Sequence, residues 1–326
     1  MSSCNSGYNG QYMGARIASV FVLLALSALG SFFPLVASKC ECLCIPKKVF
    51  FVSKYFGSGV IIATAFIHLL GEAQANFASP CLDSSWDDYP WSSAFALMGA
   101  FAMFTIELFV QKGMQHRHQM EHEQADEEQQ VAKAGVVGTK EEEIQEQEVE
   151  STSSEEDFLE KQSKFNKLLN LFLLEFGIVF HSVFVGLSLA IAGREFPTLF
   201  IAISFHQFFE GLGIGSRFAS TVWPEKLRSL PWIFALVFSL TTPIGIAAGL
   251  GVRTIYLSDS TLLLLVVGIF DSFCAGLIMY NCAVELMARD FLEDEEFQNC
   301  RFRKIVVGYL CLVAGTIAMA VIGRWA

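Results

Sequence analysis

The sequence predicts an all-α polytopic membrane protein with eight transmembrane helices. Of its 326 residues, 53% are hydrophobic, a larger share than soluble domains usually carry. Eight apolar stretches of at least 18 residues recur along the chain, and a helix of about 20 residues crosses the hydrocarbon of a bilayer. Short polar segments and one long acidic segment separate these stretches, so each can be a separate span.

The predicted spans follow one another from residue 14 to residue 322. The first stretch lacks a charged n-region and a clear small-residue cleavage site, so we expect it to be retained as a span rather than removed as a signal peptide. The fourth and fifth stretches are separated by only four residues and should form an antiparallel hairpin. In chain order the stretches are Gly14–Ala37, Val49–Gln74, Trp91–Val110, Leu168–Ala192, Pro197–Ser220, Leu230–Val252, Thr261–Met287 and Ile305–Ile322.

Basic residues predict the orientation, because cytoplasmic loops retain an excess of Lys and Arg. With the N-terminus outside, seventeen basic residues fall inside and four fall outside, while Lys54 lies within the second span. Both termini are therefore expected to be extracellular or luminal. The four outside residues are Arg16, Arg194, Arg253 and Arg324.

Nearly all of the net charge of −11 lies in one cytosolic loop, Gly113–Asn166, which has fifteen acidic and five basic residues. This Glu/Gln-rich, aromatic-poor composition cannot bury a core, so we expect disorder. Its Lys133, Lys140 and Lys161 are candidate ubiquitin acceptors. The expected division is a tail and three spans in 1–112, the acidic His-containing loop in 113–166, two central spans in 167–220 and three spans in 221–326.

Ionisable side chains stand near the middle of the two central spans. His181 lies in HSVFVG, and His206 and Glu210 lie in HQFFEG. A charge at the centre of a membrane helix costs at least about 2.5–3.5 kcal/mol, so such residues usually mark a transport path. His206 and Glu210 are four apart on one helix face, and the hairpin places His181 at the same depth. Two imidazoles and a carboxylate suit a borderline divalent metal. The alternative is a hydrogen-bonded packing cluster, but three ligand types at one depth favour a metal.

HSVFVGLSLA followed by HQFFEGLGIG resembles the paired signatures of the ZIP (Zrt-, Irt-like protein) family of divalent-metal transporters. AFIHLLGEA, TTPIGIAAG and YNCAVEL extend the resemblance, and YNGQYMGARIASVF resembles the fungal part of a plant and fungal plasma-membrane branch. The resemblance implies inverted three-helix repeats around a central two-helix hairpin and transport by alternating access. It also implies that His181, His206 and Glu210 are ligands, with Gln207 and Ser182 as auxiliary positions. Val185 stands where two-metal relatives have an acidic residue, so a single-metal centre is expected.

Three further groups are candidate metal ligands outside the centre. His68 and Glu72 lie on one face toward the outer end of the second span, where they can collect metal or form an ordinary interfacial pair. Two cytosolic groups can bind metal weakly or be chance polar residues: His116, His118 and His122 in HRHQMEHE, and Cys40, Cys42 and Cys44 in CECLC. Cys4 and Cys81 are the cysteines outside in this topology, and a disulfide between them is left open.

The expected function is uptake of Zn²⁺ into the cytosol across the plasma membrane, with Fe²⁺, Mn²⁺ and Cd²⁺ left open as cargo. No permanent cofactor is expected. The expected partners are the metal ion and the lipid bilayer; no nucleic-acid surface is expected, and a homodimer is left open. The chain has no phosphate-binding GxxxxGK[ST] motif, which argues against an ATP-driven pump. A metal-sensing receptor without flux and an intramembrane zinc hydrolase are the alternatives, and the hydrolase would need a further histidine or general base.

Overall fold

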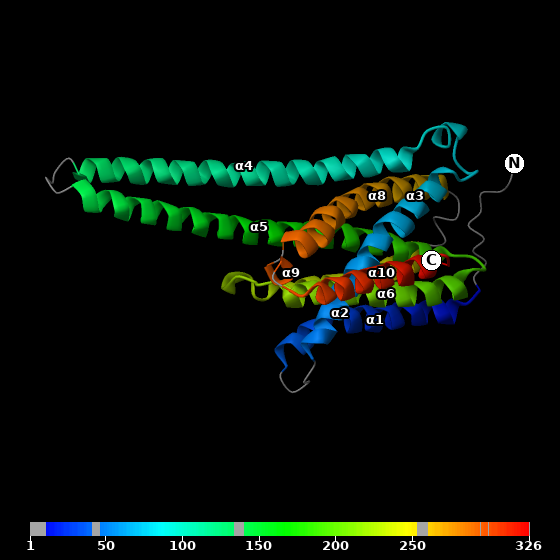
Figure 1. The fold of residues 1–326 in the computed structure, drawn as a ribbon. Coiled ribbons are helices and arrows are strands. Elements are labelled where there is room, and N and C mark those ends of the chain that lie inside the picture. Colours follow the sequence, from blue (N-terminus) through cyan, green and yellow to red (C-terminus); the bar gives the residue numbers. More distant parts are fainter. Residues whose placement is uncertain are drawn as a thin grey trace. The chain divides into compact units, whose positions relative to one another are not determined.

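The computed structural model describes residues 11–40, 46–133, 140–252, 260–293, 295–298 and 300–325. Every regular element in these ranges is a helix, and no strand occurs in them (Figure 1). The elements are α1 (Met13–Lys39), α2 (Lys47–Ala63), η2 (Thr64–Leu69), α3 (Leu70–Phe77), η3 (Ser84–Trp86), α4 (Trp91–Lys133), α5 (Lys140–Ile191), α6 (Phe196–Ser220), η4 (Glu225–Leu227), α7 (Leu230–Val252), α8 (Ser260–Asn281), η6 (Cys282–Glu293), α9 (Glu295–Gln298) and α10 (Phe302–Ile322).

The all-helical prediction is confirmed for the described part of the chain, and seven helical segments there are long and apolar enough to cross a membrane. The fifth predicted stretch, which corresponds to α6, is not one of the seven. Its 25 residues suffice in length, but His206, Gln207 and Glu210 lower its hydropathy. Seven segments therefore qualify by composition alone, where the sequence analysis expects eight spans.

The chain divides into two compact units, which are described separately. The first contains the residues up to Ala100 and those from Leu173 onward; the second is Phe101–Phe172. The second unit consists of the later part of α4 and the earlier part of α5. Helix α4 continues to Lys133 and α5 begins at Lys140, so the structure has helix over most of the acidic loop that composition predicts to be disordered. The predicted division of the chain at 112, 166 and 220 stays a prediction.

Close helix packing in the first unit depends on small residues. Helix α6 packs against α1 and α2, and α10 packs against α2. A Cβ on Gly57 of α2 would lie 2.2 Å from the Cα of Gly213 in α6, and a Cβ on Gly245 of α7 would lie 2.4 Å from the carbonyl oxygen of Val183 in α5. Because only glycine allows these approaches, the backbones beside the central hairpin come close enough to hold its side chains in place.

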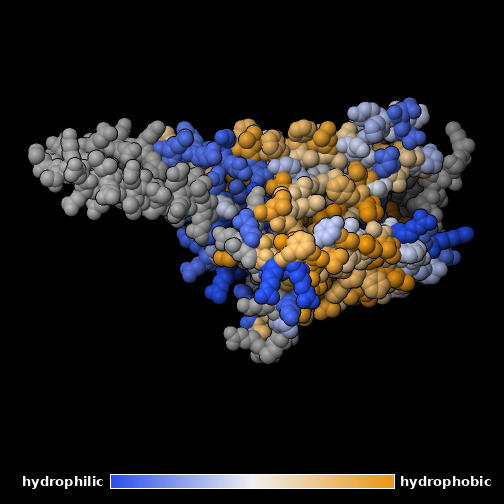
Figure 2. Space-filling model, viewed as in Figure 1, coloured by the Kyte–Doolittle hydropathy of each residue, from blue (hydrophilic) through white to orange (hydrophobic). Residues whose placement is uncertain are grey.

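Helix α6 has a polar buried side and an apolar exposed side. His206 and Glu210 are fully buried, whereas Ile201 and Phe205 are 60% and 52% exposed. This arrangement reverses that of a helix on a soluble protein and suits a helix whose outer side contacts lipid. On the face seen in Figure 2, apolar side chains likewise cover the middle of the helices, and hydrophilic residues gather toward the helix ends.

A buried arginine ties α1 to the central hairpin. The Arg16 guanidinium donates hydrogen bonds to the carbonyl oxygens of Leu189, Ala190 and Ala192, at 3.2, 2.8 and 2.5 Å. Its Cζ also lies 4.3 Å from the centroid of the Phe196 ring. Leu189 and Ala190 lie in the last turn of α5, where carbonyls lack a partner within the helix, and Ala192 directly follows the helix. Arg16 therefore satisfies these carbonyls and fixes the turn between α5 and α6.

Candidate metal centre

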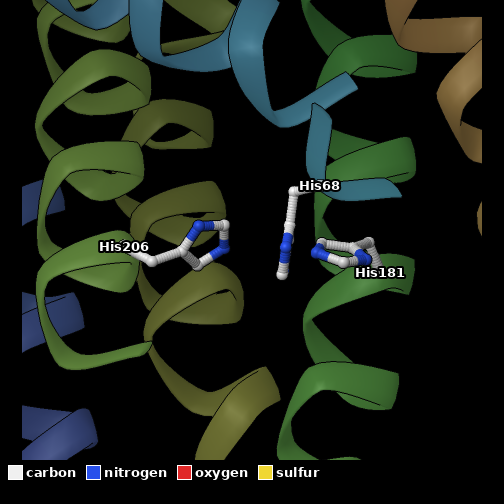
Figure 3. Close-up of side chains that lie close together, drawn as sticks. All are labelled: His68, His181 and His206. Carbon is white, nitrogen blue, oxygen red and sulfur yellow. The ribbon is translucent and has the colours of Figure 1, made fainter. Parts of the chain in front are cut away.

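Three histidines from three different helical elements converge in the first unit. His68 comes from η2, His181 from α5 and His206 from α6, and all three side chains are buried. Each offers a ring nitrogen, and these nitrogens lie within 4.8 Å of one another. In Figure 3 the His68 ring lies between the other two, with centroids 5.2 Å from His181 and 4.7 Å from His206. Among the described residues this is the one group of three or more such side chains close enough to share an ion.

The position of His68 differs from the sequence-based expectation. We expected His68 and Glu72 at the outer mouth, apart from the central site, but the structure places His68 against His181 and His206. The reason is a π-helical segment, Thr64–Leu69, inside the second span. A π-bulge adds a residue to the helical turn and changes the direction of the side chains around it, and such bulges often occur at functional sites.

His181 is oriented by a carboxylate from another helix. Its Nδ1 lies 3.1 Å from Oδ1 of Asp271 in α8, and both side chains are buried. A carboxylate accepts a hydrogen bond, so the His181 proton is held on Nδ1 and the lone pair of Nε2 remains available. That Nε2 has no hydrogen-bond partner among the described residues. Metal-ligating histidines commonly have such a carboxylate partner.

His206 contacts the fourth candidate ligand. Its Nε2 lies 3.2 Å from Oε2 of Glu210, one turn further along α6. Its Nδ1 lies 3.4 Å from the Met319 sulfur of α10, a weak acceptor. Glu210 therefore adjoins the histidine group, and His206 and Glu210 share one helix face as the sequence spacing predicts.

The size of the group suits a metal after a small contraction. Three nitrogens bound to one Zn²⁺ at about 2.1 Å lie about 3.4 Å from one another in a tetrahedron. The histidine nitrogens lie within 4.8 Å of one another, so side-chain rotation and small helix shifts suffice to close the shell. Three imidazoles and one carboxylate would satisfy the coordination preference of a borderline divalent ion.

The auxiliary positions surround the histidines without completing a second metal site. Ser182 and Gln207 are buried, and the Ser182 hydroxyl and both Gln207 amide atoms have no hydrogen-bond partner among the described residues. Val185 lies in an apolar cluster with Leu189 and Ile246. An aliphatic side chain cannot bind a metal, so this position offers no ligand.

The remaining candidates lie elsewhere or outside the described residues. Glu72 Oε2 lies 3.9 Å from His68 Nε2, next to the histidine group. His116 and His118 are on α4 in the second unit, and the structure does not describe the His122 side chain. Cys40 is a free, exposed thiol. The structure records Cys81 as disulfide-bonded. Cys4, Cys42 and Cys44 lie outside the described residues.

Two acidic residues near the centre were not assigned to it from the sequence. Asp271 lies in the seventh predicted span, and its contact with His181 joins positions far apart in the chain. Glu175 of α5 was not selected, although a carboxylate in an apolar span is itself a signal. It is 4% exposed.

Comparisons with known proteins agree on one family. A family model described as "ZIP Zinc transporter" matches residues 13–323. The chain is 37% identical to "Zinc-regulated transporter 1" of Saccharomyces cerevisiae, over 98% of this chain and 89% of that protein. It is 34% identical to "Zinc-regulated transporter 2" of the same yeast, over 99% and 96%. It is also 29% identical to "Fe(2+) transport protein 1" of Oryza sativa subsp. japonica, over 95% and 84%.

Proposed function

Because the chain belongs to the ZIP zinc transporter family, we propose that it carries Zn²⁺ across a membrane through the centre formed by His68, His181, His206 and Glu210. The single observation that carries this proposal is the buried convergence of the three histidines. Among the described residues no hydrogen bond satisfies the Nε2 atoms of these three buried imidazoles, although Glu210 lies 3.2 Å from that of His206. Burying them in this way is costly, and a bound cation would satisfy all three lone pairs. The cation is the cargo, so binding has to be reversible.

The ligand set supports zinc as the main cargo. Imidazole nitrogen suits Zn²⁺ and Fe²⁺ better than it suits Mg²⁺ or Ca²⁺, which prefer oxygen. The yeast relatives are named for zinc and the rice relative for Fe²⁺, so Fe²⁺ is the second candidate cargo. Mn²⁺ and Cd²⁺ follow as related divalent ions. A His₃Glu shell needs no permanent cofactor.

The proposed architecture has eight spans, with α6 as the eighth that composition alone does not select. Three observations support this role for α6: its length, its burial of the polar side and the exposure of its apolar side. In the proposal, inverted three-helix repeats flank the α5–α6 hairpin, and motion of the repeats relative to it gives alternating access. The proposed division keeps the loop 113–166 between the third span and the hairpin.

The proposed orientation places both termini outside the cell, with the protein in the plasma membrane and Zn²⁺ moving into the cytosol. The bias of basic residues toward the inner loops supports it. Lys133, Lys140 and Lys161 then face the cytosol, where ubiquitin can be attached. A homodimer is compatible with this arrangement.

Flux into proteoliposomes tests the proposed function. Purified full-length protein should transport Zn²⁺ down its gradient into vesicles that contain a zinc-sensitive dye. The controls are protein-free vesicles with the same lipid content and vesicles that contain the same amount of the His206→Ala variant. A metal-sensing receptor or a hydrolase would give no flux, so correctly inserted wild-type protein without Zn²⁺ flux would refute transport. Selective labelling of engineered cysteines at Ser3 and Ser220 in intact cells tests the orientation.

A further inference from the structure

Glu175 is a buried carboxylate that the histidine centre does not use. It lies on α5, six residues or about 1.7 turns before His181, and is 4% exposed. Neither of its oxygens has a hydrogen-bond partner among the described residues. An isolated buried carboxylate is one of the most costly groups in an apolar environment, so a bound cation would stabilise its ionised form.

Hairpin geometry places Glu175 at nearly the same depth as Glu210. Glu175 precedes His181 by six residues, about 9 Å along the helix axis, and Glu210 follows His206 by four residues, about 6 Å. Because α5 and α6 run antiparallel from the turn at 192–195, both steps lead toward the same end of the hairpin. The two carboxylates thus lie beyond the histidines, with depths that differ by about 3 Å.

When both are ionised, the carboxylates of Glu175 and Glu210 repel each other, and a cation held between them would relieve this repulsion. Two further buried oxygen donors lie at the depth of the histidines: Ser182, seven residues after Glu175 and on the same face of α5, and Gln207, on the same face of α6 as Glu210. The Gln207 oxygen and the Ser182 hydroxyl have no hydrogen-bond partner among the described residues. Unpaired oxygens therefore lead from the histidine level toward the two carboxylates.

We propose that Glu175 and Glu210 form a second station for the transported divalent cation, reached when the ion leaves the histidines. This inference rests on the proposed transport function. Glu210 is shared: it contacts His206 in the histidine centre and lies within about 3 Å of the depth of Glu175 along the hairpin. The ion exchanges nitrogen ligands for oxygen ligands, which bind zinc-like ions less tightly and harder ions such as Mn²⁺ relatively better. In the proposed orientation this station lies on the cytosolic side and speeds release.

Mn²⁺ binding gives a readout that is independent of flux. The free-Mn²⁺ electron paramagnetic resonance signal would be titrated with detergent-solubilised full-length protein, using wild type, Glu175→Gln and the exposed-residue control Glu225→Gln. We expect Glu175→Gln to weaken Mn²⁺ binding by at least about tenfold, since even indirect ligand partners cost 10–100-fold. In vesicles it should lower the maximal rate of Zn²⁺ flux by a similar factor and leave the equilibrium Zn²⁺ Kd within about threefold, because the histidines remain.

Unchanged Mn²⁺ affinity in folded Glu175→Gln would overturn the station. If Glu175→Gln elutes as aggregate, Glu175→Asp decides instead: weakened Mn²⁺ binding supports the station and wild-type binding overturns it. The two proposals fail separately. If the wild-type protein binds Mn²⁺ through Glu175 but carries no Zn²⁺, transport is refuted and the site stands. If the wild-type protein carries Zn²⁺ normally, and Glu175→Gln changes neither Mn²⁺ binding nor Zn²⁺ flux, the site is refuted and transport stands.

Discussion

Nδ1 of His181 lies 3.1 Å from Oδ1 of Asp271, although the two residues are 90 positions apart in the chain. The contact joins α5 to α8 at the depth of the histidine group. It fixes the direction of the His181 ring and leaves Nε2 toward His68 and His206. A residue that binds no metal itself therefore controls the geometry of one that does, and any movement of α8 relative to α5 would alter the centre.

Replacing Asp271 by Asn should weaken Zn²⁺ binding. The amide cannot stabilise the Nδ1 proton as a carboxylate does, so the Nε2 lone pair becomes a poorer ligand. Loss of such a partner typically costs 10–100-fold in metal affinity, and we expect the lower half of that range because the Asn oxygen still accepts a hydrogen bond. Isothermal titration with Zn²⁺ measures the effect. Asp83→Asn, at an exposed site, is the matched control, and equal affinities for Asp271→Asn and wild type would show that the contact is only structural.

Replacing His68 by Ala should reduce the maximal Zn²⁺ flux by at least about tenfold, as should His206→Ala, because each removes one ligand of the same shell. Glu72→Gln should have a smaller effect, since Glu72 Oε2 lies 3.9 Å from His68 Nε2. Initial rates of Zn²⁺ flux into vesicles at several Zn²⁺ concentrations give the maximal rate and the KM of each variant. A raised KM with unchanged maximal rate in His68→Ala would support the collecting role at the outer mouth that the sequence suggests.

The helical fold and the central hairpin could be predicted from hydropathy and spacing, because both signals are local. Span length follows from bilayer thickness, and the short link before Phe196 requires an antiparallel pair. The helical character of residues 140–166 could not be predicted in this way, since this Glu/Gln-rich segment has too few apolar residues to form an apolar helix face. The count of spans is also ambiguous by composition, because the ligands on α6 make that helix the most polar of the candidates.

Two parts of the centre could not be predicted from spacing, for different reasons. The position of His68 toward the outer end of the second predicted span indicates a place near the mouth, and single-sequence patterns do not reveal the π-helical segment that contains it. The pairing of Asp271 with His181 does not follow from spacing, since a contact between α5 and α8 depends on tertiary packing. His181, His206 and Glu210 were placed at one depth because one hairpin holds all three.

Asp290 links three helical elements and should be important for stability. Its carboxylate lies 2.9 Å from Lys54 Nζ of α2 and 2.7 Å from Arg217 Nη2 of α6, and that guanidinium also donates to Ser58 Oγ at 2.8 Å. Asp290→Asn leaves two largely buried cations without a counter-charge. We expect it to lower the free energy of unfolding by about 3 kcal/mol. This is the lower end of the loss typical of a buried ion pair that loses one partner, because the side chains here are 10–19% exposed.

Thermal unfolding in detergent tests the role of Asp290, with the exposed Asp87→Asn as control. A double-mutant cycle with Arg217→Met isolates the pair. If Asp290→Asn lowers the free energy of unfolding by the same amount in the presence and in the absence of Arg217, the two side chains do not interact. Replacing both by apolar residues should restore much of the stability, because no charge then remains unpaired at this contact.

The cytosolic ligand groups should act after transport rather than in it. His116 and His118 lie on α4 within the second unit, and Cys40 is an exposed thiol, whereas the histidine centre is buried in the first unit.

Replacing Cys40, Cys42 and Cys44 by Ser, or His116, His118 and His122 by Ala, should leave initial Zn²⁺ uptake within about twofold of wild type at equal surface abundance, because no ligand of the central shell is removed. A chase in high Zn²⁺ should then reveal altered removal from the cell surface or altered tolerance of excess metal, since accessible thiols and imidazoles can sense cytosolic metal. Initial uptake reduced as strongly as in His206→Ala would place these groups on the transport path.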